Sequence, residues 1–96
     1  MKARYTLTAA RELDQSVDYL IAHAPHVAAD FVGALDNAIG ELLDHPYSAP
    51  QTDRVGVRRK YVARFRYAIF YAVDSNADEL VILSVRHAAR RWPWQD

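Results

Sequence analysis

The chain has 96 residues, about half of them hydrophobic and a quarter charged, as expected for a single small globular domain spanning residues 1–96. It contains no cysteine, so disulfides, thiolate metal sites and cysteine nucleophiles are excluded, and a reducing, cytoplasmic setting is favoured. The net charge is zero, yet residues 1–53 carry three cations and eight acids, whereas residues 54–96 carry nine cations and four acids. This division predicts a basic surface that meets an acidic protein or a polynucleotide.

The N-terminal half of the sequence predicts a short strand followed by two helices. Residues 3–8 (ARYTLT) alternate like a short strand, and Thr8 is a candidate N-cap for the helix that follows. That helix has apolar residues at helical spacing, namely Leu13, Val17, Leu20, Ile21 and Ala24. Pro25 ends it and suits the first turn of a second helix, which stops near His45. The apolar positions of the second helix are Ala28, Phe31, Val32, Leu35, Ile39, Leu42 and Leu43.

The second half is strand-like. After a loop over residues 46–56, residues 57–73 would form a strand about three times the usual length, so we expect a bend near residues 63–66. Residues 74–78 (DSNAD) predict a turn, and residues 79–85 (ELVILSV) predict a last strand that is apolar on both faces. The order predicts an α+β fold: an N-terminal strand, a two-helix hairpin, and a three-stranded antiparallel sheet with one face covered by the hairpin.

The sequence lacks the motifs of metal sites, serine hydrolases and phosphate-binding loops. His23, His26, His45 and His87 do not form a metal-ligand pattern, because Pro25 interrupts the helix between the first two. The serines lack the glycine-flanked turn of a hydrolase nucleophile, and three glycines leave no phosphate-binding loop. No stretch is apolar enough for a signal peptide or a membrane span. We therefore expect no metal ion, no cofactor and no membrane partner.

The basic segment interleaves cations with aromatic rings. Strand periodicity places Arg58 and Lys60 on one face and Arg59 and Tyr61 on the other. Two interpretations stay open: a solvated face whose arginines lie over tyrosine rings, or a recognition face for an acidic partner. Two interpretations also stay open for the tail, in which Pro93 keeps the chain extended. Its tryptophans either fold back on the core or contact a partner. The expected target-binding residues are Arg58, Lys60, Arg64, Arg66, Arg86, Arg90, Arg91, Trp92 and Trp94.

Four segments in order resemble the RelE/ParE superfamily of bacterial toxin–antitoxin toxins, and the ParE branch most closely. They are YTLTAARELDQSVDYL, ALDNAIGELLDHP, GVRRKYVARFRYAIFYAV and VILSVRHAARRW, which together span nearly the whole chain. The resemblance implies a toxin of the plasmid-stabilisation type, held inactive by a ParD-like or RelB-like antitoxin. ParE-like members act on DNA gyrase, whereas RelE-like members cut mRNA on the ribosome.

The sequence departs from the ribonuclease branch at the positions that usually carry its catalytic side chains. That branch usually has an arginine after the first tyrosine of the central strand and another after the last strand, with a terminal tyrosine or histidine. Here Ala68 follows Tyr67, Ala88 lies in the second region, and no tyrosine follows Tyr71. The resemblance therefore favours a non-enzymatic gyrase inhibitor, with a ribosome-dependent mRNA endoribonuclease as the alternative. A ribonuclease would depend on Arg59, Arg64, Arg66, His87 and Arg90, with His87 as the acid or base.

Overall fold

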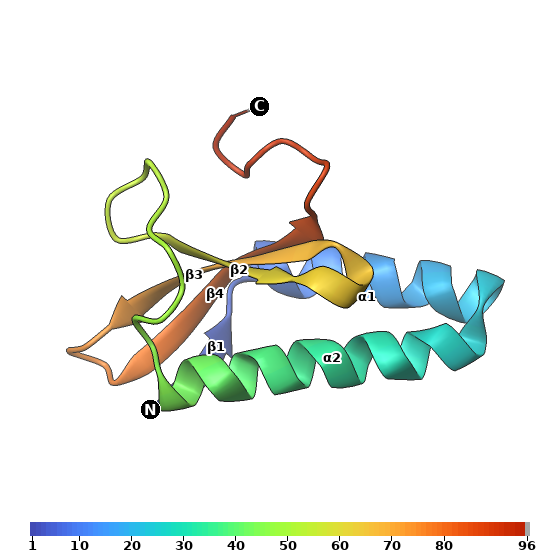
Figure 1. The fold of residues 1–96 in the computed structure, drawn as a ribbon, viewed down its shortest axis with the longest axis horizontal. Helices are drawn as coiled ribbons and strands as arrows, with labels where there is room; N and C mark the ends of the chain where they lie inside the picture. Colours follow the sequence, from blue (N-terminus) through green and yellow to red (C-terminus); the bar gives the residue numbers. More distant parts are fainter. Residues whose placement is uncertain (96) are drawn as a thin grey trace.

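A computed structural model of the chain, which describes residues 1–95, has two helices packed against one face of a four-stranded sheet (Figure 1). The elements in order are β1 (Lys2–Tyr5), α1 (Leu7–His23), α2 (Pro25–Asp44), β2 (Arg58–Val62), a 3-10 turn (Ala63–Phe65), β3 (Tyr67–Asp74) and β4 (Glu79–His87). This order confirms the predicted α+β fold. Within the described residues, neither helix is long and apolar enough to cross a membrane.

The sheet is mixed, with strand order β1-β4-β3-β2. Strands β2, β3 and β4 are antiparallel, as predicted, but β1 pairs with β4 in parallel, from Lys2 opposite Glu79 to Tyr5 opposite Ile82. The two helices carry the chain from β1 to β2 at the far edge, and two hairpin connections then bring it back. Strand β4 therefore arrives beside β1 running in the same direction.

The corner between β1 and α1 differs from the prediction. The N-cap is Thr6, not Thr8, because the Thr6 hydroxyl accepts a hydrogen bond from the Ala9 N–H at 3.1 Å. The same hydroxyl donates to the Leu83 carbonyl at 3.1 Å, which ties the corner to β4. Thr8 lies inside the helix. The proline prediction is confirmed, since Pro25 is at the first turn of α2.

The predicted bend between β2 and β3 is confirmed. The 3-10 turn over Ala63–Phe65 is followed by Arg66 with φ of 55°, a left-handed conformation that reverses the chain without glycine. The Arg66 carbonyl accepts a hydrogen bond from the Ala88 N–H at 2.7 Å, so the bend also holds the start of the tail. The predicted turn at residues 74–78 is confirmed as well, with Asp74 Oδ1 accepting from the Ala77 N–H at 3.1 Å.

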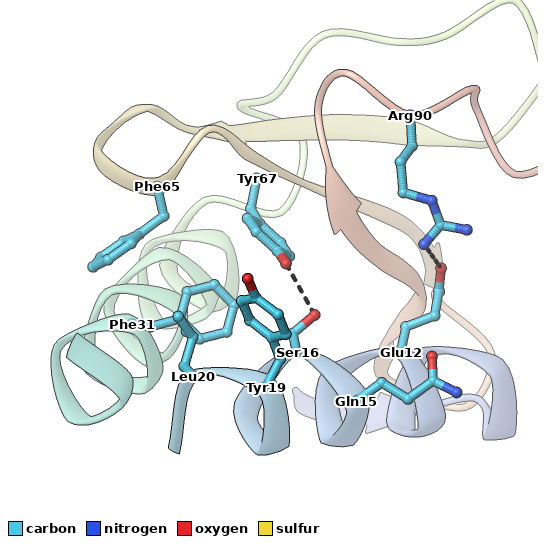
Figure 2. Close-up of a pocket in the computed structure, with 9 residues that line it drawn as sticks. All are labelled: Glu12, Gln15, Ser16, Tyr19, Leu20, Phe31, Phe65, Tyr67 and Arg90. Carbon is cyan, nitrogen blue, oxygen red and sulfur yellow. Dashed lines mark hydrogen bonds and ion pairs between the residues drawn. The ribbon is translucent and has the colours of Figure 1, made fainter. Parts of the chain in front are cut away.

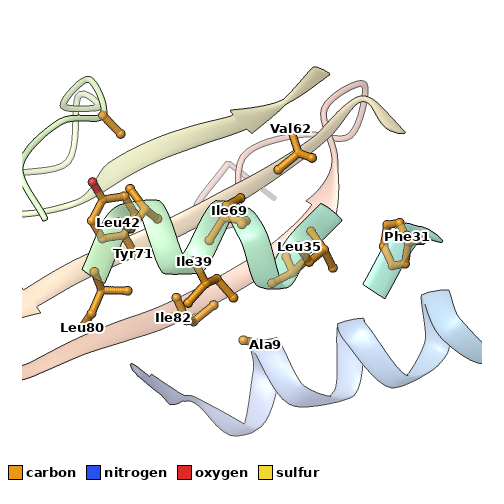
Figure 3. Close-up of a cluster of buried hydrophobic side chains, with 13 residues drawn as sticks. Ala9, Phe31, Leu35, Ile39, Leu42, Val62, Ile69, Tyr71, Leu80 and Ile82 are labelled. Carbon is orange, nitrogen blue, oxygen red and sulfur yellow. The ribbon is translucent and has the colours of Figure 1, made fainter. Parts of the chain in front are cut away.

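The sheet has apolar clusters on both faces. The main core lies between the helices and the sheet, and its buried side chains include Ala9, Phe31, Leu35, Ile39, Leu42, Ile69, Tyr71, Leu80 and Ile82 (Figure 3). A smaller cluster on the opposite face consists of Val57, Ala68 and Phe70 with Leu83, Trp92 and Trp94 packed against them. Two predicted stripe residues, Ile21 and Val32, are instead 56% and 37% exposed on the hairpin.

Candidate target-binding surface

The tail after β4 packs on the sheet face opposite the helices, as Figure 1 shows. The rings of Trp92 and Trp94 lie edge-on to Phe70, with centroid separations of 5.8 and 5.6 Å, and 5.6 Å from each other. Trp94 Nε1 donates to Asp53 Oδ1 at 3.2 Å, which fixes the far end of the tail. Both tryptophans are therefore half-buried against the sheet, which is the fold-back arrangement.

Arg59 on β2 extends this cluster. Its guanidinium carbon lies 5.7 Å from the ring centre of Tyr61 and 5.9 Å from those of Phe70 and Trp92. No carboxylate within residues 1–95 forms an ion pair with it, and its buried Nε has no hydrogen-bond partner there. The guanidinium therefore lies against aromatic rings, with no carboxylate of residues 1–95 paired to it.

A basic, aromatic surface results, which we call the tail face. It consists of Arg54, Arg59, Tyr61, Arg91, Trp92 and Trp94. Arg54 lies over Trp94, with its guanidinium carbon 5.2 Å from the ring centre, and Tyr61 is 47% exposed. Within residues 1–95, the acid at this surface is Asp53, whose Oδ1 accepts the hydrogen bond from Trp94. Among these described residues, cations therefore outnumber acids on the tail face.

Three of the expected target-binding cations make internal contacts on the helix side. Arg58 Nη1 donates to the backbone carbonyls of Tyr47 and Ala49 at 3.0 and 2.7 Å, anchoring the loop before β2. Lys60 pairs with Glu41 of α2 at 3.0 Å. Arg64 pairs with Asp30 of α2 at 3.2 Å. As strand periodicity predicts, Arg58 and Lys60 lie on the face opposite to Arg59.

Arg86 is not at the surface where the sequence places it. Its side chain is 8% exposed, and Nη2 pairs with Glu12 Oε2 at 2.8 Å. Its other nitrogens donate inside the protein, Nε to Ser84 Oγ at 2.9 Å and Nη1 to the Arg91 carbonyl at 3.0 Å. Sequence reasoning missed Glu12, although its helical spacing from the buried Ala9 was a signal that it faces the sheet.

A cleft of about 360 Å³ lies between α1 and β3 (Figure 2). It is lined by Glu12, Gln15, Ser16, Tyr19, Leu20, Phe31, Phe65, Tyr67 and Arg90. Tyr67 Oη donates to Ser16 Oγ at 3.0 Å across it. Arg90 is 58% exposed at one end, with Nη1 3.9 Å from Glu12 Oε2.

The five residues that a ribonuclease would need are not all gathered at one place. Arg90 alone of the five lines the cleft. Its backbone N–H donates to the His87 carbonyl at 3.0 Å, and the His87 ring lies edge-on to Tyr67 with a centroid separation of 5.7 Å. Arg59 belongs to the tail face, Arg64 pairs with α2, and Arg66 is exposed at the bend. In the described part of the chain, no group of three or more His, Cys, Asp or Glu side chains is placed to hold a metal ion.

Comparison with known proteins identifies the family. Residues 3–92 match the family described as "ParE toxin of type II toxin-antitoxin system, parDE". The chain belongs to the ParE toxin family. A protein of Sinorhizobium fredii (strain NBRC 101917 / NGR234) named "Putative toxin Y4kP" is 30% identical over 92 residues, covering 96% of this chain and 93% of that protein. The sequence resemblance is thereby confirmed.

Solved structures show the same fold. A protein of the chromosomal ParDE toxin–antitoxin system from P. aeruginosa has a TM-score of 0.75 at 21% identity, covering 91% of this ParE-family chain and 95% of that chain. A chain of the toxin–antitoxin complex RelBE2 from Mycobacterium tuberculosis has a TM-score of 0.59 at 26% identity, covering 90% and 95%. Because structures from ParE and RelE systems share this fold, the fold alone does not determine the target.

Proposed function

We propose that this ParE-family toxin inhibits DNA gyrase by binding it through the tail face together with Arg90, and that it is not a ribonuclease. The observation that carries the proposal is the burial of Ala68, which is 1% exposed beneath the folded tail. The family resemblance would require an arginine here for RNA cleavage. While the tail is in place, a guanidinium at this position would have no contact with solvent and no cavity to occupy.

The arrangement of the remaining cations supports the same conclusion. Cleavage of RNA needs an acid or base and several cations around one phosphate, held in place before the reaction. His87, Arg59 and Arg64 instead contact three different parts of the molecule: Tyr67, the tail rings and Asp30. Such a distribution suits binding of a partner better than catalysis.

The tail face has the composition of a protein-binding surface. Arginine and tryptophan are the residue types most often found as interface anchors, and Arg91, Trp92 and Trp94 form a short segment with them. The surrounding positive charge would attract an acidic surface and raise the rate of association. We therefore assign target contact to Arg90, Arg91, Trp92 and Trp94, with Arg59 and Arg54 alongside.

A cognate antitoxin belongs to the proposal. The M. tuberculosis structure is that of a toxin–antitoxin complex, and the P. aeruginosa structure is that of a ParDE system. We propose that a ParD-like or RelB-like protein neutralises this toxin in the same way, through an amphipathic segment that is acidic where it meets the basic half of the chain. Complementary charge would speed capture of the toxin.

The experiment uses purified toxin in a gyrase supercoiling assay with detection of cleaved DNA. We expect wild-type toxin to inhibit supercoiling, and the triple variant Arg90→Ala, Arg91→Ala, Trp92→Ala to lose inhibition while keeping its circular dichroism. The matched control removes two cations and one exposed ring elsewhere: Arg4→Ala, Arg11→Ala and Tyr47→Ala.

Two outcomes would contradict the proposal. Full inhibition by the triple variant would exclude the tail as the contact surface. A parallel translation reaction with message mapping covers the alternative, because message cut in phase with codons, together with unaffected gyrase, would show a ribonuclease.

A further inference from the structure

The edge of β4 beyond the end of β1 is closed by a carboxylate instead of a strand. Pairing between β1 and β4 ends at Tyr5 and Ile82, with a last hydrogen bond from the Thr6 N–H to the Ile82 carbonyl at 3.0 Å. After this point α1 leaves the sheet. Glu12 Oε1 then accepts from the Val85 N–H at 3.3 Å and from Ser84 Oγ at 2.7 Å. The carboxylate satisfies the Val85 N–H, a backbone donor that a longer β1 would otherwise have met.

The other oxygen of Glu12 holds Arg86. The distance from Oε2 to Arg86 Nη2 is 2.8 Å, and the two side chains are only 11% and 8% exposed. Arg86 Nη1 in turn donates to the backbone carbonyl of Arg91 at 3.0 Å. One buried chain of polar contacts therefore runs from α1 through β4 into the tail.

Loss of the negative charge would act on the tail through this chain of contacts. A buried ion pair that loses one partner leaves an uncompensated charge, which is strongly unfavourable in the protein interior. Arg86 would regain water by moving its guanidinium outward. That movement would break its bond to the Arg91 carbonyl, which anchors the middle of the tail, and leave Trp92 and Trp94 held only by ring contacts and Asp53.

We propose that Glu12 and Arg86 are positioning residues that hold the tail on the sheet and so present the tail face to the toxin's target. The last step rests on the proposed function. The first step, control of the tail by the buried pair, is independent of what the target is. Within residues 1–95, the Arg86 guanidinium contacts Glu12, Ser84 and the tail backbone, which is why the pair acts on the tail.

The first variant is Glu12→Gln, which keeps one acceptor oxygen for Ser84 and Val85 and removes the negative charge that pairs with Arg86. Its matched control is Glu41→Gln, the same chemical change in a helix residue paired with a strand cation, but 66% exposed and remote from the tail. Trypsin needs a locally unfolded segment, so cleavage after Arg90 and Arg91 should become faster when the tail opens. We expect cleavage there to be about tenfold faster in Glu12→Gln and unchanged in Glu41→Gln.

Two further readouts separate tail release from unfolding. Tryptophan emission should move to longer wavelengths in Glu12→Gln, because both tryptophans are in the tail. Native-state hydrogen exchange should quicken in residues 88–95 while β3 and β4 stay protected. A double variant, Glu12→Leu with Arg86→Met, replaces the pair by apolar side chains that keep the core filled. It should also release the tail, since it cannot hold the Arg91 carbonyl.

The outcomes are distinct. Unchanged cleavage and emission in both variants would overturn the inference, whatever the target proves to be. Tail release with full gyrase inhibition would overturn the claim that the docked tail presents the binding surface. Tail release with loss of inhibition is the expected result. If wild-type toxin leaves gyrase unaffected, the proposed function fails, while the cleavage and exchange data still decide whether the pair positions the tail.

Discussion

Removal of one buried hydroxyl, in Tyr71→Phe, should lower the free energy of unfolding by about 1 kcal/mol. Tyr71 has no exposed surface, and its Oη donates to the Pro46 carbonyl at 2.7 Å. Phenylalanine keeps the ring and its packing and loses only this bond. Because Arg58 also anchors the same loop, the loss should stay near the value of one neutral hydrogen bond. In a domain of this size that is a fall in Tm of about 4–8 °C.

The effect should depend on pH in a definite direction. Burial raises the pKa of Tyr71 above its ordinary value of 10.0, partly offset by hydrogen bonding to the loop backbone and by the Arg58 guanidinium. As pH rises past 10, tyrosine in the unfolded chain loses its proton before Tyr71 does in the folded protein. The contribution of Tyr71 is therefore complete below the unfolded pKa and is lost as pH rises through the folded pKa. The Tm difference between wild type and Tyr71→Phe should shrink over this range.

Thermal melts followed by circular dichroism, from neutral pH to above the tyrosine range, measure both effects. Tyr61→Phe is the control, because Tyr61 is 47% exposed and its hydroxyl has no hydrogen-bond partner within residues 1–95. It should change stability by less than about 0.5 kcal/mol at neutral pH. A Tyr71→Phe variant as stable as wild type at neutral pH would refute the hydrogen-bond reasoning. A Tm gap that persists undiminished at the highest pH would refute the linkage.

Three further predictions concern the core, a helix and the tail. Leu42→Ala, at a core position with 0% exposure, should lower the free energy of unfolding in urea by about 2–5 kcal/mol, whereas Val55→Ala, at 97% exposure, should change it by less than about 0.5 kcal/mol. Gly40→Ala should raise it by up to about 1 kcal/mol in the same assay, because a Cβ there meets nothing within 4 Å in α2, while Gly56→Ala, with φ of +79°, should lower it. Ala68→Arg should displace the tail and shift tryptophan emission to longer wavelengths, and unchanged emission would show that the tail tolerates a charge beneath it.

The sequence predicts the helical part well because its signals are local. The apolar spacing and Pro25 define both helices, and the excess length of the strand-like segment locates the bend at 63–66. The direction of β1 is not a local property. It depends on which sheet edge the hairpin delivers the chain to, and no pattern in residues 3–8 contains that information. The N-cap could not be predicted from local sequence for the same reason, since the Thr6 hydroxyl also donates to the Leu83 carbonyl, far away in the sequence.

The site is predicted less completely for the same physical reason. Alternation correctly separates Arg59 from Arg58 and Lys60, because the side-chain period of a strand is fixed. It does not reveal which cations have partners. The sequence predicts that Arg86 is at the surface, because its partner Glu12 lies on a different element and is brought beside it only by the tertiary fold. Ion pairs between distant elements are a product of the tertiary fold, so a count of cations overstates the charge available to a target.

The apolar pattern of β4 ties the fold to the proposed function. Its residues are apolar on both faces, yet the helices cover only one, and an open apolar face would expose Phe70 and Leu83 to water. The tail resolves this by covering the second face with its own tryptophans. The same covering buries Ala68, at the position where the family resemblance leads us to expect an arginine in a ribonuclease. Arg59 and Arg91 lie at the edge of the surface that the tail covers. Under the proposed function, a tail docked in this way leaves its outer surface as the place where the target would bind.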